Sequence, residues 1–343
     1  MEILWFCIVA VMVAAYVVFD GFDIGAGIVH LFVARSDKEK RTVLRSIGPV
    51  WDGNEVWLLA AGGVLYFAFP ALYASSFSGF YLPLMMVLWL LILRGASIEF
   101  RNHIDGPIWS PLWDVIFGGA SALLAIFFGA ALGNVVRGVP LGEDGYFFLP
   151  LWTHFGTSGD VGILDWYTVA IGVAAFSTLA LHGALWVTMK TDGPFQVRTQ
   201  AFASVMWYVV ATFTVLITML SFQVQPVLAK NFVNAPLGAI FPILAVAGLA
   251  GIKLFKDDVR PFLASCVYIV GMLTSAAYGV FPYVLPSNQD PARGLTIYNA
   301  ATSQNGLQIG LIWWTPAMIL VIAYFVFTYR KFAGKVELEE GGY

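Results

Sequence analysis

Long apolar stretches, separated by short polar or proline-containing segments, run through the whole chain. A helix of about 20 apolar residues crosses the hydrocarbon core of a bilayer, and most of these stretches reach that length. The pattern predicts nine membrane-spanning helices, over residues 4–34, 54–74, 77–98, 115–137, 161–189, 200–229, 236–254, 261–284 and 305–331. The expected fold is all-α: one polytopic integral membrane domain over residues 1–343, with two four-helix bundles and one peripheral helix.

Lysine and arginine are divided unevenly between the two sets of connections that join these stretches. All of the 18 basic residues except Arg137, Lys230 and Arg293 fall on one side. Cytoplasmic loops carry the excess of basic residues in membrane proteins. The distribution therefore predicts a cytoplasmic C-terminus and an outside N-terminus, which agrees with an odd number of spans.

Composition supports a membrane protein and excludes several other classes. Hydrophobic residues make up 59% of the 343 residues and charged residues 11%, whereas soluble domains have about 25% charged residues. The net charge of −3 offers no basic surface for nucleic acid.

Cys7 and Cys266 fall towards opposite membrane faces, so no disulfide is expected between them. The first apolar run is expected to be a span, because it has no small-residue cleavage site. Glycines at 21–27 and 62–63 are expected to allow close helix approach.

Two aspartates near the middle of the first predicted span are the leading candidates for chemistry. Asp20 and Asp23 are three positions apart and share one helix face. Asp23 lies about 16 Å from the end of the span at Ala34. Two like charges this close repel, which favours proton uptake by one of them and suits a proton carrier. The alternative is that each aspartate pairs with an arginine or caps a helix broken around Gly21.

A second acidic pair stands where the second span begins. Asp52 and Glu55 have the spacing of a capping box, with Asp52 as the N-cap and Glu55 three residues later. The same groups would lie below Asp23 and could pass protons towards it. The sequence leaves both interpretations open.

The third cluster lies where the third span leaves the membrane. Arg94 is the expected counter-ion for a buried aspartate, and Arg101 is expected to meet lipid phosphate. Glu99 is either a further proton carrier or the partner of Arg101.

Four histidines were considered as haem or metal ligands. His103 and His154 fall in loops on opposite sides, whereas His30 and His182 lie in spans at similar depth. A haem shared by His30 and His182 is a weak possibility, because no Glu-x-x-His pattern accompanies them. Each is expected to be a hydrogen-bonded core histidine, and no metal site is predicted.

Several motifs in fixed order resemble subunit II of the cytochrome bd quinol oxidases, and the resemblance spans the whole chain. The matching stretches are Asp20–Gly25, Gly48–Trp57, Phe77–Tyr81, Arg94–Arg101, Phe281–Ser287 and Ala301–Gln304. The pattern departs from some relatives at Glu99, where they have aspartate, and at Glu55, where they have glutamine.

The resemblance implies a subunit of a terminal oxidase in the prokaryotic cytoplasmic membrane, not catalytic by itself. It implies that a partner subunit I carries haems b and d and binds most of the quinol, and it allows for a small single-helix subunit and contacts with lipids and quinone. It also implies a cytoplasmic proton path through this chain, formed by Asp20, Asp23 and Asp52, with Glu55, Arg94 and Glu99 near it.

Two other functions fit the midplane acids. A proton-coupled secondary transporter also uses buried carboxylates and glycine-broken helices, and it predicts a substrate cavity and no haem partner. A purely structural subunit would stabilise its partner and bind lipid or quinone.

Overall fold

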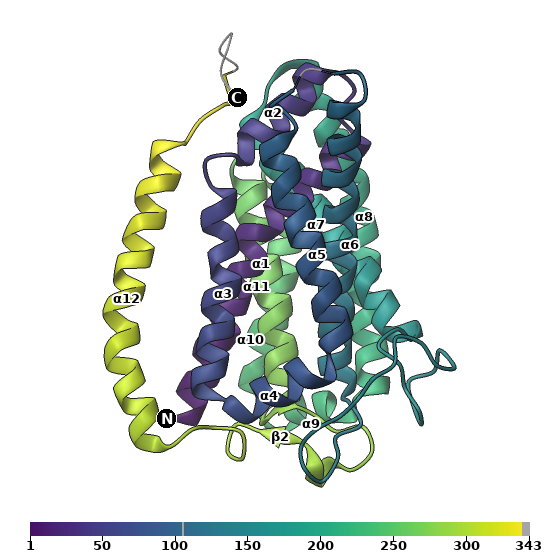
Figure 1. The fold of residues 1–343 in the computed structure, drawn as a ribbon, viewed down its shortest axis with the longest axis vertical. Coiled ribbons are helices and arrows are strands. Elements are labelled where there is room, and N and C mark those ends of the chain that lie inside the picture. Colours follow the sequence, from purple (N-terminus) through teal and green to yellow (C-terminus); the bar gives the residue numbers. More distant parts are fainter. Residues whose placement is uncertain (105, 338–343) are drawn as a thin grey trace.

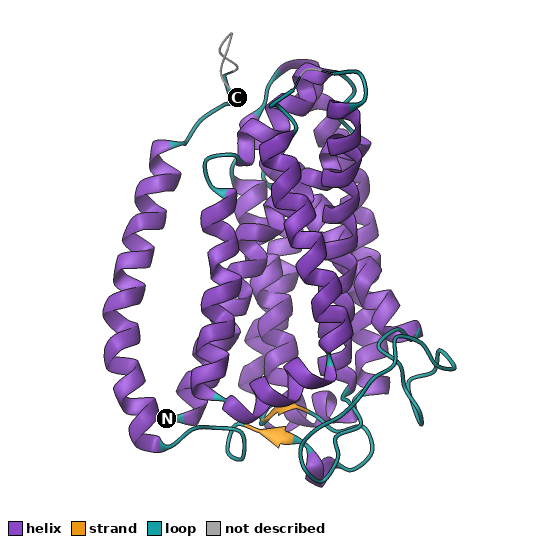
Figure 2. Cartoon of the chain, in the orientation of Figure 1, coloured by secondary structure: helices purple, strands orange, loops and turns teal. Residues whose placement is uncertain are grey.

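The computed structural model describes residues 1–104 and 106–337, and helices make up most of it (Figures 1 and 2). The all-α fold class is confirmed. The elements are α1 (Glu2–Phe32), α2 (Asp37–Ile47), α3 (Trp51–Ala68), α4 (Pro70–Gly79), α5 (Tyr81–Phe100), α6 (Trp109–Arg137), α7 (Trp166–Lys190), α8 (Gly193–Val224), α9 (Pro226–Asn234), η1 (Pro236–Ala239), α10 (Ile240–Leu254), α11 (Arg260–Val280), β1 (Tyr283–Leu285), η2 (Pro291–Arg293), β2 (Leu295–Thr296) and α12 (Gln304–Lys331).

Eight helical segments in the described part of the chain are long and apolar enough to cross a membrane, which makes this a multi-pass membrane protein. The one predicted span that is not among these eight is the second, over 54–74, which corresponds to α3; this helix runs beside the others but carries Asp52 and Glu55 in its first turns (Figure 1). The two ends of the chain lie at opposite ends of the bundle (Figure 1). This arrangement agrees with an odd number of crossings, and both the count of nine and the direction of insertion stay predictions.

Several predicted boundaries are wrong for local reasons. The span predicted over 54–74 ends at Ala68, because Pro70 cannot continue the helix and instead starts α4. The span predicted from 161 begins at Trp166, where Asp165 caps α7 with its side chain. The span predicted from 200 begins earlier, at Gly193, with a proline in its first turn. The span predicted to 284 stops at Val280, because Tyr283–Leu285 pairs with Leu295–Thr296 as a small antiparallel sheet.

Helix α1 is at the centre of the bundle, where it contacts α3, α6, α7 and α11. Glycine makes this position possible: a Cβ atom on Gly25 would lie 1.9 Å from the carbonyl oxygen of Leu179 in α7. A Cβ atom on Gly27 would likewise collide with the side chain of Ser121 in α6, 2.1 Å from its hydroxyl oxygen. Small residues that let backbones meet are typical of membrane bundles. Gly62 and Gly63 do not serve helix approach within this chain, because a Cβ atom on either would meet no other helix within 4 Å.

Helix α12 is the peripheral helix, and it stands along one edge of the bundle (Figure 1). None of its most apolar stretch is buried inside the chain. It touches α1 through aromatic pairs, Trp5 with Trp314 and Phe19 with Phe325. Its last turn and the segment after it return to the end of the bundle that holds α2, which is the end predicted to face the cytoplasm.

Candidate functional site

Three carboxylic acids from α1 and α3 lie near one guanidinium group from α5, which bonds to two of them. Arg94 donates from Nη2 to Oδ1 of Asp20 at 2.6 Å, and the same nitrogen donates to Oε1 of Glu55. Arg94, Asp20 and Asp23 are each fully buried, and Glu55 is partly exposed. We call Asp20, Asp23, Glu55 and Arg94 the acid cluster.

Asp23 has a different partner from Asp20. Asn54 of α3 donates from Nδ2 to Oδ2 of Asp23 at 2.7 Å and, more weakly, to the carbonyl oxygen of Phe19. The Oδ1 atom of Asn54 accepts a hydrogen bond of 2.9 Å from the hydroxyl of Tyr329 in α12. A chain of two hydrogen bonds therefore links the peripheral helix to a buried aspartate.

The acid cluster is short of positive charge and of hydrogen-bond partners. Three ionised carboxylates against one guanidinium would leave a net charge of −2 in a buried site, which is costly. Oδ2 of Asp20, Oδ1 of Asp23, and Nε and Nη1 of Arg94 are buried without a partner among the described residues. Buried polar atoms normally have partners. The cluster is therefore suited to take up protons or ordered water.

The structure overturns the capping-box interpretation of Asp52 and Glu55. The N-cap of α3 is Val50, and no side chain caps this helix end. Glu55 reaches Arg94 instead, and Asp52 is exposed in the first turn. The alternative of a helix broken at Gly21 is also wrong, because α1 is continuous from Glu2 to Phe32.

The expectation that Arg101 meets lipid phosphate is wrong. Its side chain is only 2% exposed and forms ion pairs with Asp114 and Asp37. Glu99 is exposed and is not the acid that pairs with Arg101. Arg94 does pair with a buried aspartate, as expected of a counter-ion.

A second buried group of charges, which the sequence analysis missed, is centred on Asp114 at the start of α6. Asp114 accepts hydrogen bonds from Nε2 of His30 at 2.7 Å, Nζ of Lys40 at 2.9 Å and Nε of Arg101 at 2.5 Å. These four residues, the Asp114 cluster, join α1, α2 and the end of α5 to α6. Asp114 was overlooked because it fell just outside the span predicted from residue 115.

The two buried histidines do not fit a shared haem. Both ring nitrogens of His182 are engaged, with the Ser265 hydroxyl at 2.7 Å and the Val18 carbonyl at 3.0 Å. His30 uses Nε2 for Asp114, and its Nδ1 has no partner among the described residues, so a shared haem would lack its second ligand, His182. Each histidine is a hydrogen-bonded core residue with its own partners. Within residues 1–104 and 106–337, no group of three or more histidine, cysteine or acidic side chains could hold a metal ion.

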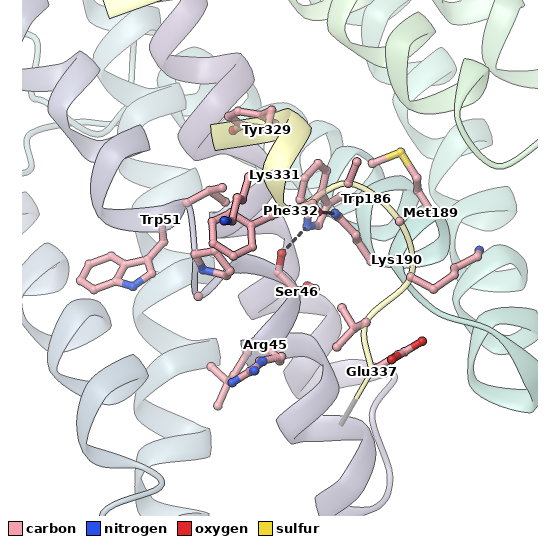
Figure 3. Close-up of a pocket in the computed structure, with 18 of the residues that line it drawn as sticks. Arg45, Ser46, Trp51, Trp186, Met189, Lys190, Tyr329, Lys331, Phe332 and Glu337 are labelled. Atoms are coloured by element: carbon pink, nitrogen blue, oxygen red, sulfur yellow. Dashed lines mark hydrogen bonds between the residues drawn. The ribbon is translucent and has the colours of Figure 1, made fainter. Parts of the chain in front are cut away.

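A cavity of about 940 Å³ opens at the predicted cytoplasmic end of the bundle (Figure 3). We call it the strap cavity, because the segment after α12, residues 332–337, forms one of its walls. Trp51, Glu99, Trp186, Lys190 and Tyr329 line it from α3, α5, α7 and α12. Asn54, Tyr329 and this cavity were absent from the sequence-based site. The polar run that contains Asn54 was the one available signal, whereas nothing local marked Tyr329.

Comparisons with known proteins agree with the resemblance in the motifs. "Probable cytochrome oxidase subunit 2" of Haemophilus influenzae is 31% identical over 98% of this chain and 95% of its own length. "Cytochrome bd-I ubiquinol oxidase subunit 2" of Escherichia coli is 29% identical over 99% of this chain and 96% of its own length. "Cytochrome bd ubiquinol oxidase subunit 2" of Bacillus subtilis is 29% identical over 98% and 97%.

The fold is also that of a solved structure. A chain of the bd oxidase from Geobacillus thermodenitrificans superposes with a TM-score of 0.78 at 16% identity, over 96% of this chain and 98% of that one. The family model described as cytochrome bd terminal oxidase subunit II matches residues 1–332. The chain therefore belongs to the cytochrome bd terminal oxidase subunit II family.

Proposed function

We propose that this chain carries protons from the cytoplasm, through Asp23 and Asp20, to the oxygen-reducing site of a membrane quinol oxidase. Family membership makes the chain part of a respiratory terminal oxidase complex in the bacterial inner membrane. The observation that supports a proton path is the acid cluster, in which one buried guanidinium bonds to Asp20 and Glu55 while the buried Asp23 has only the Asn54 amide as its side-chain partner.

The chemistry of oxygen reduction requires such a path. Each electron passed to dioxygen on its way to water needs one proton, and quinol oxidation releases protons elsewhere. Taking the consumed protons from the cytoplasm and releasing the quinol protons outside moves charge across the membrane without a pump. Arg94 keeps part of the acid cluster ionised, and the partnerless oxygens of Asp20 and Asp23 are the atoms that would exchange protons.

The proposal assigns the redox chemistry to other subunits. Haems b and d and most of the quinol contacts would belong to subunit I, with this chain stabilising the complex, and a small single-helix subunit, lipids and quinone would complete it. Full engagement of His182 supports this division, because both of its ring nitrogens are already bonded and it cannot pair with His30 as a second haem ligand. Asp52, Glu55 and Glu99 would serve the path near its cytoplasmic end.

The secondary-transporter alternative gains no support, because the relatives named above are oxidase subunits over nearly their full length. A purely structural role is the remaining competitor. It predicts that removing a carboxyl group changes assembly rather than turnover.

The deciding experiment replaces Asp23 with asparagine in the intact complex and measures quinol-driven oxygen uptake per haem. Loss of a proton-carrying group is expected to lower the rate about 100-fold while the haem spectrum is unchanged. The matched control is Asp160→Asn, which removes an exposed carboxyl group at the opposite end of the bundle. Unchanged turnover over a wide pH range would refute the relay, and lost haem absorbance would indicate an assembly role.

A further inference from the structure

We infer that the strap cavity is the cytoplasmic mouth of the proton path, and that Tyr329 and Asn54 are positioning residues that hold Asp23 at its inner end. This inference rests on the proposed function and deepens it. Its starting point is a cavity with charged residues in its lining, one of whose lining side chains, Tyr329, is two hydrogen bonds away from a buried carboxyl group.

The wall formed by residues 332–337 is fastened to the bundle at several points. The backbone N–H of Val336 donates to the carbonyl of Lys190 at 2.8 Å, and Nζ of Lys190 donates to the carbonyl of Phe332. Nζ of Lys335 pairs with Asp258 at 2.8 Å. Figure 3 shows Lys190, Phe332 and Glu337 around the same hollow, with Trp51 and Tyr329 at its margin. The segment thus holds the end of α12 against α7 and keeps the cavity walls in place.

The strap cavity has charged side chains in its lining that can hold water beside its apolar wall. These charged residues are Arg45, Glu99, Lys190, Asp258, Lys331, Lys335 and Glu337. Ordered water needs two to four polar partners and enough room, and the cavity provides both. Protons that reach the cavity from the cytoplasm would therefore remain in contact with water as far as the ring of Tyr329.

The path from the cavity to the acid cluster passes the Tyr329 hydroxyl. This hydroxyl donates to Oδ1 of Asn54 at 2.9 Å, and Nδ2 of Asn54 donates to Oδ2 of Asp23 at 2.7 Å. A neutral amide does not accept and release protons readily, so Asn54 fixes the carboxyl group rather than relaying the proton. Oδ1 of Asp23, which has no partner among the described residues, is the atom left to take a proton from water.

The proton step is then a simple transfer. A hydronium ion that has passed inward from the cavity beyond Tyr329 gives its proton to Oδ1 of Asp23, an O–H bond forms there, and a water molecule is left beside it. The proton later leaves Asp23 for Asp20, and Asp23 is ready again. This assignment differs from intake at Asp52, because Asp52 is exposed on α3 and is absent from the lining of the cavity.

The first test closes the cavity reversibly. Ala333→Cys is made in a chain with Cys7→Ser and Cys266→Ala, and the assembled complex is labelled with a bulky methanethiosulfonate reagent. Ala333 is exposed and lines the cavity, and Lys38→Cys, exposed on α2 away from it, is the matched control. Oxygen uptake with pre-reduced quinol is expected to fall about tenfold for Ala333→Cys alone, and to return when a reductant removes the label.

The second test removes only a hydroxyl. Tyr329→Phe keeps the ring that packs against Phe325 and Trp186, and Tyr324→Phe is the matched control on the same helix. Tyr329→Phe is expected to lower turnover about threefold to tenfold, as loss of one hydrogen bond to the site would. It should also raise the solvent deuterium isotope effect, because proton delivery becomes rate-limiting. A merely structural role for the hydroxyl would leave the isotope effect unchanged.

The outcomes separate this inference from the proposed function. If Asp23→Asn abolishes turnover but the labelled cavity and Tyr329→Phe leave rate and isotope effect unchanged, intake lies on the Glu55 side and the inference is wrong. If Asp23→Asn itself keeps full turnover, the proton path through this chain is wrong. Lower turnover in Asp23→Asn, in the labelled Ala333→Cys chain and in Tyr329→Phe, with normal haem spectra, supports both the proposed function and this inference.

Discussion

The acid cluster and the Asp114 cluster are both buried groups of charges, but they are balanced in opposite directions. In the acid cluster, Arg94 is the one cation among three carboxyl groups, of which it bonds two, and several buried atoms have no partner among the described residues. In the Asp114 cluster, one carboxyl group accepts bonds from a histidine, a lysine and an arginine. The first arrangement favours exchange of protons. The second favours a fixed charge that holds four segments together.

The largest expected effect comes from taking away the single cation of the acid cluster. Arg94→Met would leave Asp20 and Asp23 buried without a counter-ion, which costs about 3–5 kcal/mol when one partner of a buried pair is lost. We expect little assembled complex, measured as haem absorbance after purification.

The double variant Arg94→Met/Asp20→Asn sharpens this result. Neutralising Asp20, the buried acid that bonds directly to Arg94, removes one of the uncompensated charges, so the haem-containing complex should recover in part while oxygen uptake stays low. If the amount of haem-containing complex does not recover, Arg94 stabilises the bundle by packing rather than by charge.

In the Asp114 cluster we expect a smaller loss of stability, and no loss of oxygen uptake. Asp114→Asn weakens the bonds to Lys40 and Arg101 and should lower the stability of the complex by about 2 kcal/mol, seen as a lower Tm. Oxygen uptake per assembled haem should be unchanged, because this cluster holds helices and passes no proton. Slower turnover in Asp114→Asn at normal haem content would erase the distinction between the two clusters.

The smallest effect is expected at the surface, where α2 is tied to α8. Burial alone would raise the pKa of Glu39, but bonds from Arg198 and from the amides of Arg35 and Ser36 outweigh it and hold that pKa below its ordinary 4.5. A depressed folded-state pKa stabilises the protein above pH 4.5, and this stabilisation disappears as pH falls through the folded value.

Glu39→Gln tests that contribution in thermal melts of the complex. The change should cost about 0.5 kcal/mol at neutral pH, as for other exposed ion pairs, and nothing at strongly acidic pH. Lys38→Gln, which alters a neighbouring exposed charge, is the control. An equal loss for Glu39→Gln at neutral and at acidic pH would contradict the proposed role of the ion pair with Arg198.

Part of the site could be predicted from single residues, because a charge inside an apolar stretch is conspicuous wherever the helix packs. Asp20, Asp23 and Arg94 were found in this way. The sequence suggested a local partner for Glu55, the end of its own helix. In the structure Glu55 instead forms an ion pair with Arg94 of another helix, and no side chain caps α3. Asp114 and Arg101 were missed or misassigned because their partners come from other helices.

The sequence by itself determined the apolar lengths, the helical class and the depth of the buried acids. These properties depend on the solvation of each stretch in lipid, which is local. Only the tertiary structure decided which charges meet. Asp20 and Arg94 are 74 positions apart, and Asn54 and Tyr329 are 275 apart. Their pairing depends on how glycines let α1 approach its neighbours and on where α12 returns to the bundle, and no local pattern encodes either.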